Sequence, residues 1–184
     1  RSIVHLQSET VGLHLIKKTG NQAAPTAYPL SFTDETGRPG TDMTFFIFPR
    51  QSRAQRGTNM ISRVSFRVPS DAALDYWALR LKDRGLRVAV RRRQFDAAVL
   101  DFEDADGQAY QLISDQDDHG VAGGVPWRHS DVPPEFAIVG LGPVAVTVIN
   151  AAHLTRLLTT TLGFTQDETI GSQTLYHVGA GGHG

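Results

Sequence analysis

Arginine, histidine and acidic side chains carry the chemistry that this sequence can offer, because it contains no cysteine and so no thiolate nucleophile or ligand. Arg63 and Arg67 belong to the alternating stretch RVSFRVP, in which Val64, Phe66 and Val68 form the apolar set. A period of two places both arginines on the opposite face of a predicted strand. On that face they could hold an anionic or phenolic ligand, or they could form ordinary ion pairs.

The seven histidines offer imidazole groups for metal binding or proton transfer. His177 lies in LYHVGAGG, inside a predicted strand, and is a candidate metal ligand, with an ordinary strand position as the alternative. The other six histidines are expected to be exposed or structural, because they lie in irregular stretches, at the start or end of a helix, or on a strand surface. They are His5, His14, His119, His129, His153 and His183.

Two clusters of charge imitate known binding motifs and are better explained as surface. A calcium loop needs twelve residues and a terminal glutamate, so a hairpin turn explains the acidic residues of LDFEDADG better: Asp101, Glu103, Asp104 and Asp106. A second cluster consists of arginines and could suggest a nucleic-acid patch: Arg50, Arg53, Arg56, Arg91, Arg92 and Arg93. We expect solvated surface instead, because acids are interspersed, few aromatic residues are nearby and the chain has no net positive charge.

The bulk composition excludes several classes of protein. The 184 residues are 40% hydrophobic and 20% charged, and the net charge of −1 gives no reason to expect nucleic acid or an anionic membrane as a partner. No apolar run approaches the ~18 residues that span a bilayer. The first residues, RSIVHLQSET, lack the basic region and apolar core of a signal peptide. We therefore expect a cytoplasmic protein.

The candidate residues are positioned by a unit that occurs more than once. Its two clearest copies are RVSFRVPSDAALDYWALRLKDRGLRV and PVAVTVINAAHLTRLLTTTLGFTQ. Each begins with apolar alternation, passes through a helix-capping residue, Ser70 or Asn150, and continues with apolar residues at helical spacing. Each predicted helix ends near a glycine, Gly85 or Gly163, which suits the left-handed position after a helix.

A third, partial copy lies at the N-terminus, where ETVGLHLIKK reads like TTLGFTQDET. Predicted strands follow it in AYPLSF and TDMTFFIF, around the turn DETGRPG. The middle copy likewise continues into AAVLDF, the turn EDADG and QAYQLIS. The repeated unit is therefore a strand, a helix and three further strands, which predicts an α+β fold of tandem βαβββ modules.

Tandem βαβββ units resemble the vicinal oxygen chelate superfamily, which includes glyoxalase I, bleomycin-resistance proteins and extradiol dioxygenases. Five stretches, taken together, are similar to its ring-cleaving, hydroquinone-type dioxygenase branch: GLHLIKKTGNQ, GRPGTDMTFFIFP, RVSFRVP, LDFEDADGQAYQL and AIVGLGPVAVTV. The resemblance runs from about Glu9 to Gly182. It implies a cup-shaped mixed sheet with the helices outside.

The resemblance also implies a domain organisation, because family members have four units, paired two by two. We expect residues 1–114 to form two βαβββ modules, the first without its initial strand, and residues 115–137 to be a linker. Residues 138–184 would begin a second, incomplete glyoxalase-like domain. The chain would then be a fragment whose third unit lacks a sister unit, and homo-oligomerisation could cover the strand edge and apolar face left open.

A metal in the cup is a further implication of the resemblance, since extradiol members hold Fe(II) with two histidines and one glutamate. The matching positions here are Arg63, Gln111 and Pro143. Gln111 could offer a carbonyl oxygen, whereas Arg63 opposes a cation by roughly 4 kcal/mol per pair of unit charges at about 4 Å. We therefore assign no metal ligand beyond the candidate His177, and expect Arg63, Arg67 and Gln111 to bind substrate.

The function that the resemblance implies is a ring-cleaving dioxygenase, which uses Fe(II) to insert oxygen into a hydroquinone- or catechol-type ring. That activity would need residues outside this chain. One alternative is a metal-free protein of the bleomycin-resistance type, which binds a small aromatic molecule in the same cup. Another is a glyoxalase-like lyase.

Overall fold

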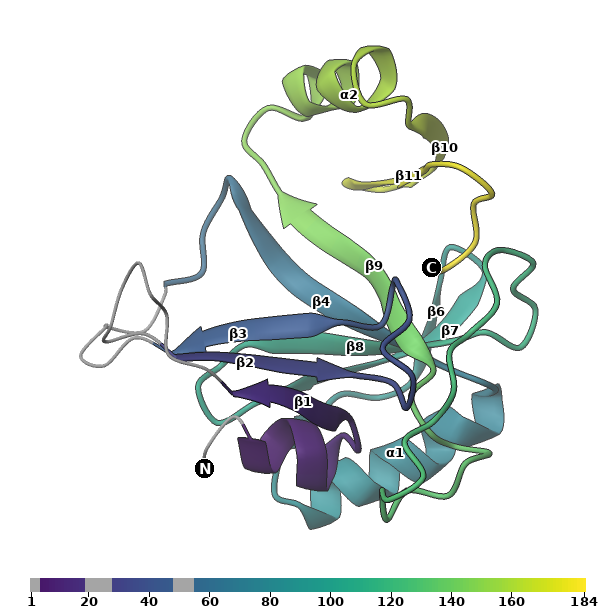
Figure 1. Ribbon diagram of the computed structural model, residues 1–184. Coiled ribbons are helices and arrows are strands. Elements are labelled where there is room, and N and C mark those ends of the chain that lie inside the picture. Colours follow the sequence, from purple (N-terminus) through teal and green to yellow (C-terminus); the bar gives the residue numbers. More distant parts are fainter. Residues whose placement is uncertain (1–3, 19–27, 48–54) are drawn as a thin grey trace.

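The computed structural model describes residues 4–18, 28–47 and 55–184, which form three successive groups of elements (Figure 1). The first group contains the π-helical turn η1 (His5–Thr10), β1 (His14–Lys18), β2 (Tyr28–Thr33) and β3 (Met43–Ile47). The second contains β4 (Met60–Val68), α1 (Asp71–Asp83), β5 (Arg87–Val88), β6 (Arg92–Gln94), β7 (Ala97–Glu103) and β8 (Ala109–Ser114). The third contains β9 (Gly140–Thr147), α2 (Ala151–Thr160), β10 (Thr165–Ile170) and β11 (Gln173–His177).

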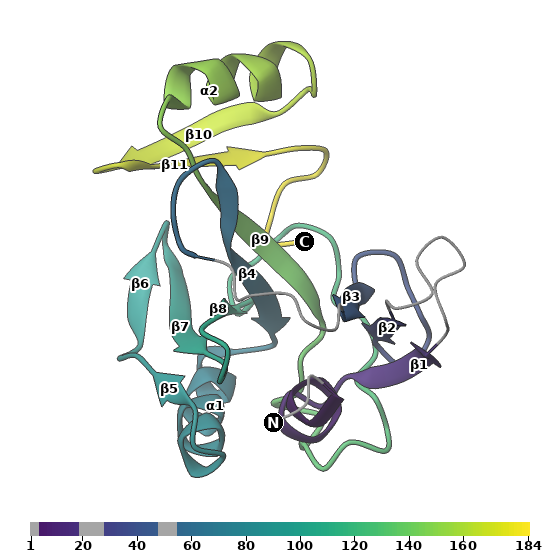
Figure 2. The ribbon, with the colours of Figure 1, turned by 90° about the vertical axis from the view of Figure 1, so that its left-hand side faces the viewer.

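The central sheet has the strand order β5-β7-β8-β4-β9, with β6 also paired to β7 (Figure 1). It is mixed, because β4 and β8 run parallel while the other pairs are antiparallel. Parallel strands need a long crossover connection, and α1 provides it between β4 and the hairpin of β7 and β8. Two smaller antiparallel sheets, β1-β2-β3 and β10-β11, lie beside and above the central one (Figure 2).

The two helices begin and end where the sequence predicts. Ser70 caps α1 by accepting a hydrogen bond from Ala73 N at 3.2 Å, and Asn150 caps α2 in the same way from His153 N at 3.3 Å. Gly85 and Gly163 follow the helices with φ of +76° and +73°. This left-handed conformation is open to glycine at little steric cost, so it ends each helix sharply.

The main core lies between α1 and one face of the central sheet. Leu74, Trp77 and Leu81 recur at helical spacing and are fully buried against Phe66 and Tyr110. The alternation of β4 sends its apolar residues to this side, so its polar residues lie on the other face. We call the side of the central sheet that is turned away from α1 the cup face.

The irregular segment 115–137 packs against the first two groups of elements. Val132 and Ala137 are buried in the main core, and the indole nitrogen of Trp77 donates a 2.7 Å hydrogen bond to the carbonyl of Phe136. Asp131 forms an ion pair with Arg80 on α1. Burial raises the pKa of Asp131, but the hydrogen bond and charge of Arg80 and the charge of Arg84 outweigh burial and lower it. The segment therefore fixes α1 to its surroundings.

Asp34 connects the same segment to the turn after β2. Its carboxylate accepts backbone N–H groups from residues 36, 37 and 38 of its own turn and from Val125, at 2.7 to 3.2 Å. Burial raises the pKa of Asp34, but these four N–H groups outweigh burial and hold it below its ordinary value. The negative charge is therefore part of the fold.

The predicted α+β fold of βαβββ units with helices outside a cup-shaped mixed sheet is confirmed. The first strand of the third unit joins the central sheet, because β9 pairs antiparallel with β4 through Val144 opposite Val64. That this unit lacks a sister unit stays a prediction. The boundaries of the two domains and the linker at 115–137 stay a prediction. Among the described residues, no helix is long and apolar enough to cross a membrane.

Candidate ligand site on the cup face

Three neighbouring strands bring polar side chains into one row on the cup face. Gln111 on β8 is the register partner of Ser65 on β4 and of Asp101 on β7. Paired residues on adjacent strands project to the same side of a sheet, so the three side chains meet. Arg63, two residues before Ser65, projects to this side as predicted and reaches Asp101.

The amide of Gln111 is buried and fully engaged. The residue is 4% exposed; its nitrogen donates to Asp101 Oδ1 at 2.7 Å and to Gln94 Oε1 at 3.1 Å, and its oxygen accepts from Ser65 Oγ at 3.3 Å. Because both ends of the amide are satisfied by neighbours, removing it would leave buried polar groups without partners. Gln111 therefore holds the network together, and its oxygen, the atom that would bind a metal, already accepts a hydrogen bond from Ser65.

Asp101 is the centre of this network. Arg63 contacts its Oδ1 at 3.3 Å and Arg92 contacts its Oδ2 at 2.7 Å, so two cations face one carboxylate. The Nε of Arg63 is buried and has no hydrogen-bond partner among the described residues. The group of Arg63, Arg92 and Asp101 thus has an excess of one positive charge and one unsatisfied donor, which suits an anionic oxygen.

Apolar side chains lie beside the polar row. Ala97, Val99 and Ile113 form a buried cluster on the cup side of β7 and β8. From the third group, Gln173 at the start of β11 accepts a 3.0 Å hydrogen bond from Gln94 Nε2. A small molecule beside the polar row would therefore meet a cationic edge and a side chain from a separate sheet.

The metal positions implied by the resemblance do not fit a divalent cation. Arg63 occupies the first of them and is tied to Asp101, Gln111 occupies the second with its amide satisfied, and Pro143 on β9 has no donor atom to give. A guanidinium in contact with the one carboxylate of the site neutralises the charge that would attract the metal.

A second cluster has suitable donor types but also contains an arginine. Asp115, Asp118 and His183 offer two carboxylates and an imidazole whose atoms lie within 4.8 Å of one another. Arg67, 4% exposed, contacts the carboxylates at 2.8 and 3.3 Å and also donates to the carbonyl of Val121 at 2.6 Å. This buried cation offsets one of the two carboxylate charges and would compete with a metal for both carboxylates, so we describe the cluster as an ion-pair network.

The sequence-predicted residues therefore fall into separate places. Arg63 and Gln111 meet at Asp101, whereas Arg67 lies in the ion-pair network and not beside Arg63. His177 lies on β11 with its Nδ1 3.8 Å from Asp167, apart from both clusters. The prediction that Arg63, Arg67 and Gln111 bind substrate stays a prediction for each of them.

The other histidines also lie outside the cup network. His14 stacks on Trp127, with ring centroids 5.3 Å apart and planes 4° from parallel, and His183 contacts Asp115. His119 and His129 are exposed on the packed segment, and His153 is exposed at the start of α2. The side chain of His5, like the predicted surface residues Arg50 and Arg53, lies outside the described part of the chain.

The acidic cluster divides between a strand and a turn. Asp104 builds the predicted hairpin turn, since its Oδ1 accepts the N–H groups of Asp106 and Gln108 at 2.9 Å each. Asp101 lies earlier, on β7, and points to the cup face. The alternation of β7, in which Leu100 and Phe102 are buried in the core, is the signal that could have placed Asp101 there.

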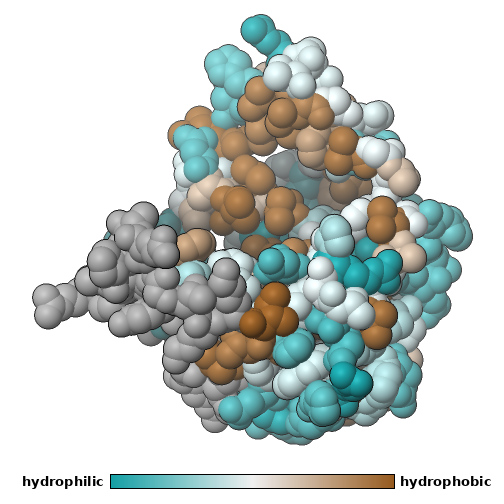
Figure 3. All heavy atoms as spheres, viewed as in Figure 1, coloured by the Kyte–Doolittle hydropathy of each residue, from teal (hydrophilic) through white to brown (hydrophobic). Residues whose placement is uncertain are grey.

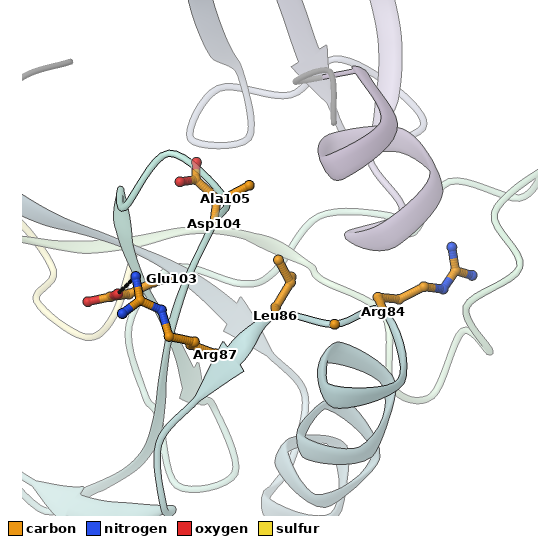
Figure 4. A pocket seen from close by; sticks show the side chains of 7 residues that line it. Arg84, Leu86, Arg87, Glu103, Asp104 and Ala105 are labelled. Carbon is orange, nitrogen blue, oxygen red and sulfur yellow. Dashed lines mark ion pairs between the residues drawn. The ribbon is translucent and has the colours of Figure 1, made fainter.

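A surface pocket lies between the end of α1 and this turn (Figure 4). Arg87 and Glu103 form a 3.0 Å ion pair on one side of Leu86, and Arg84 points away on the other side. A hydrogen bond from Arg56, together with the charges of Arg56 and Arg87, outweighs a small burial effect and lowers the pKa of Glu103. The residues that line this pocket include none of the cup network.

No family model matches the chain. Among characterised sequences it is similar to two proteins of Bacillus subtilis (strain 168) that are named provisionally as ring-cleaving dioxygenases. It is 39% identical to MhqA over 158 residues, which are 86% of this chain and 49% of MhqA. It is 31% identical to MhqE over 159 residues, which are 86% of this chain and 50% of MhqE. The chain thus spans about half the length of these relatives.

Solved structures agree with the fold. A provisionally named dioxygenase from Bacillus subtilis subsp. subtilis str. 168 matches 95% of this chain and 54% of its own, with a TM-score of 0.83 and 24% identity. A glyoxalase/bleomycin resistance protein/dioxygenase domain from Frankia sp. EAN1pec matches 60% of this chain and 78% of its own, with a TM-score of 0.50 and 17% identity. The chain belongs to the vicinal oxygen chelate superfamily, as a relative of proteins named as its ring-cleaving dioxygenases.

Proposed function

We propose that this chain is part of a ring-cleaving dioxygenase for a hydroquinone- or catechol-type ring, and that its cup face binds the aromatic molecule without coordinating the metal. The observation that carries the second half of the proposal is the pairing of Arg63 with Asp101, beside the fully engaged amide of Gln111. The names and the 39% identity of the relatives support the first half. The Fe(II) that such a reaction uses would be held by residues outside the cup face.

The residues of the cup face have separate roles in this proposal. Arg63, through its unsatisfied Nε, and Arg92 stabilise a phenolate oxygen, because each places a guanidinium at the same edge of the network. Val99 and Ile113, which are already buried, support the strands that carry this network. With neither a cysteine nor a helix that could cross a membrane in the described chain, we place this activity in the cytoplasm.

The test is binding of 4-nitrophenol, whose ionisation near neutral pH changes its visible absorbance. We expect binding that EDTA leaves unchanged, with the pKa of the bound phenol lowered by the arginines. Arg63→Gln should weaken binding at least about tenfold and reduce the pKa shift, since a charge-assisted hydrogen bond is worth about 1.5–3 kcal/mol and Arg92 remains. The matched control is Arg91→Gln, which removes an exposed arginine paired with Asp75.

Two results would contradict this proposal. One is binding that disappears on chelation, which would mean that a metal holds the phenol. The other is equal affinity of Arg63→Gln and Arg91→Gln, which would mean that the cup face is not the site. Either result would leave the family assignment intact, because that assignment rests on the relatives and the fold.

A metal-free binding protein is the second candidate, and the same network favours it. Gln111 and two arginines satisfy the carboxylate of Asp101 without a metal ion, as a permanent metal-free cup requires. Oxygen consumption separates the candidates when it is measured on the full-length protein loaded with Fe(II): consumption with a hydroquinone identifies a dioxygenase. Retained 4-nitrophenol binding without oxygen consumption favours the binding protein.

A further inference from the structure

We propose that Gln94 and Gln173 are positioning residues of the ligand site, because they form a one-way relay of amide hydrogen bonds that connects the third group to the carboxylate of Asp101. The inference deepens the proposed function and rests on it, since the arginines that Asp101 holds are the ones proposed to bind a phenolate. Neither glutamine needs to touch the bound molecule.

The direction of the relay is set at its inner end. A carboxylate only accepts hydrogen bonds, so the atom of Gln111 that lies 2.7 Å from Asp101 Oδ1 must be the amide nitrogen. Ser65 Oγ, 3.3 Å from the other end of the amide, donates to its oxygen. A glutamine amide can be reversed with little change of shape, but reversal here would place two acceptors against each other. Gln111 is therefore held in one orientation.

The same constraint passes outward from one amide to the next. Gln111 Nε2 also donates to Gln94 Oε1 at 3.1 Å, which leaves the nitrogen of Gln94 on the far side. That nitrogen donates to Gln173 Oε1 at 3.0 Å. Gln173 must therefore present an acceptor to Gln94, and a donor in its place would oppose the whole row of amides.

The outer end of the relay belongs to the third group. Gln173 begins β11, and the β10-β11 sheet lies over the central sheet (Figures 1 and 2). The molecular surface is hollowed beneath α2, between the third group and the central sheet (Figure 3). Every residue of β10 is exposed, and among the described strands β10 pairs with β11 alone. The side-chain bond from Gln94 is thus a direct tie between the third group and the cup face.

Loss of this outer bond is expected to loosen the inner ones. Gln94 is half-buried, and without Gln173 its amide can turn away from Gln111. One N–H group of Gln111 would then lack a partner at a residue that is 4% exposed, which is costly. Asp101 would be free to shift between its two arginines, which changes the charge that they present to a phenolate.

A pair of substitutions at position 173 separates the relay from simple electrostatics. Gln173→Glu keeps an acceptor for Gln94 and adds a negative charge, whereas Gln173→Lys offers only donors and adds a positive charge. Charge alone would make the lysine variant bind a phenolate more tightly than the glutamate variant. The relay predicts the opposite order. The matched controls, Gln166→Glu and Gln166→Lys, make the same changes of charge on β10 of the same hairpin, and both positions are exposed, so all four variants are expected to fold.

Two measurements are made on each variant. One is the affinity for 4-nitrophenol and the pKa of the bound phenol, read from its visible absorbance. The other needs no ligand: it is the rate of hydrogen exchange of the side-chain amide of Gln111, followed by NMR and identified by its absence in Gln111→Met. We expect Gln173→Lys to bind at least about threefold more weakly than Gln166→Lys, as fits the loss of one exposed hydrogen bond. Its Gln111 amide should also exchange at least about threefold faster, while Gln173→Glu matches Gln166→Glu within about twofold in both measurements.

The proposal requires both effects of Gln173→Lys. The absence of either one, relative to Gln166→Lys, would overturn it, and so would tighter binding by Gln173→Lys than by Gln173→Glu. Failure of the proposed function has a different signature, because Arg63→Gln would then bind 4-nitrophenol as tightly as Arg91→Gln. In that case the exchange rate of the Gln111 amide decides alone whether the relay exists, and an unchanged rate in Gln173→Lys overturns it.

Discussion

Gln111→Glu introduces a second carboxylate into the cup network without changing the size of the side chain. Gln111 Nε2 lies 2.7 Å from Asp101 Oδ1 and donates to it, so a glutamate would replace an attraction by a repulsion. The bond to Gln94 at 3.1 Å would be lost as well. Position 111 is also the one where the resemblance implies a metal ligand, so the variant tests whether a carboxylate alone restores a metal site.

The magnitude follows from burial and from the ordinary pKa of glutamate. At 4% exposure beside Asp101, the new carboxyl is expected to protonate. Keeping it neutral at pH 7 costs about 4 kcal/mol at about 1.4 kcal/mol per pH unit, because its ordinary pKa is about 4.3. Arg63 and Arg92 lower this cost, so we predict a loss of about 2–4 kcal/mol in the free energy of unfolding at pH 7.

The assay is urea unfolding at pH 5, 6 and 7, followed by circular dichroism. A folded-state pKa raised above the unfolded value makes the variant lose stability as pH rises, so its deficit should shrink from pH 7 to pH 5. Gln108→Glu, at an exposed position of the same hairpin, is the control and should change stability by less than about 0.5 kcal/mol. A deficit equal to that of the control, or one independent of pH, would refute the reasoning.

Two further substitutions test the packing of segment 115–137. Asp34→Asn should cost about 1–3 kcal/mol at pH 7, because an amide nitrogen cannot accept the N–H of Val125. The pKa of Asp34 is lower in the folded than in the unfolded protein, so its charge stabilises the fold above the unfolded pKa. This stabilisation is lost as pH falls through the folded pKa, so urea unfolding at pH 3 should show a smaller difference in stability between Asp34→Asn and the unsubstituted protein. Gly12→Ala should cost about 1–3 kcal/mol by thermal unfolding, because φ is +81° and the new methyl would lie 2.5 Å from Ser130 Oγ. Gly171→Ala, with φ of +60° and open space, should cost about 1 kcal/mol, and equal losses would contradict the close contact.

Local patterns in the sequence predicted the elements, because strand alternation, caps and C-terminal glycines act over a few residues. Ser70 and Gly85 marked the ends of α1, and the period of β4 separated Arg63 from the core side. The repetition of these patterns then predicted the fold class, since a repeated unit that cannot bury its apolar side alone must pack against another copy.

Pairings between distant segments could not be read in the same way. The partner of β9 is β4, about 80 residues away, and alternation alone does not choose between partners. Arg67 and Arg63 share one strand face, but segment 115–121 folds back and engages Arg67 through Asp115 and Asp118. Asp101 was predicted inside the strand AAVLDF, but local alternation could not show that its carboxylate meets Gln111, Arg63 and Arg92.

The central claim is that arginine and amide groups take the place of metal ligands on the cup face. Anaerobic equilibrium dialysis of the 184-residue chain against Fe(II), followed by elemental analysis, measures it directly. Since Arg63 already occupies the carboxylate of Asp101, we predict below about a tenth of an equivalent of iron. About one equivalent in this chain, absent from Gln111→Ala and retained in Asp118→Asn, would contradict the account.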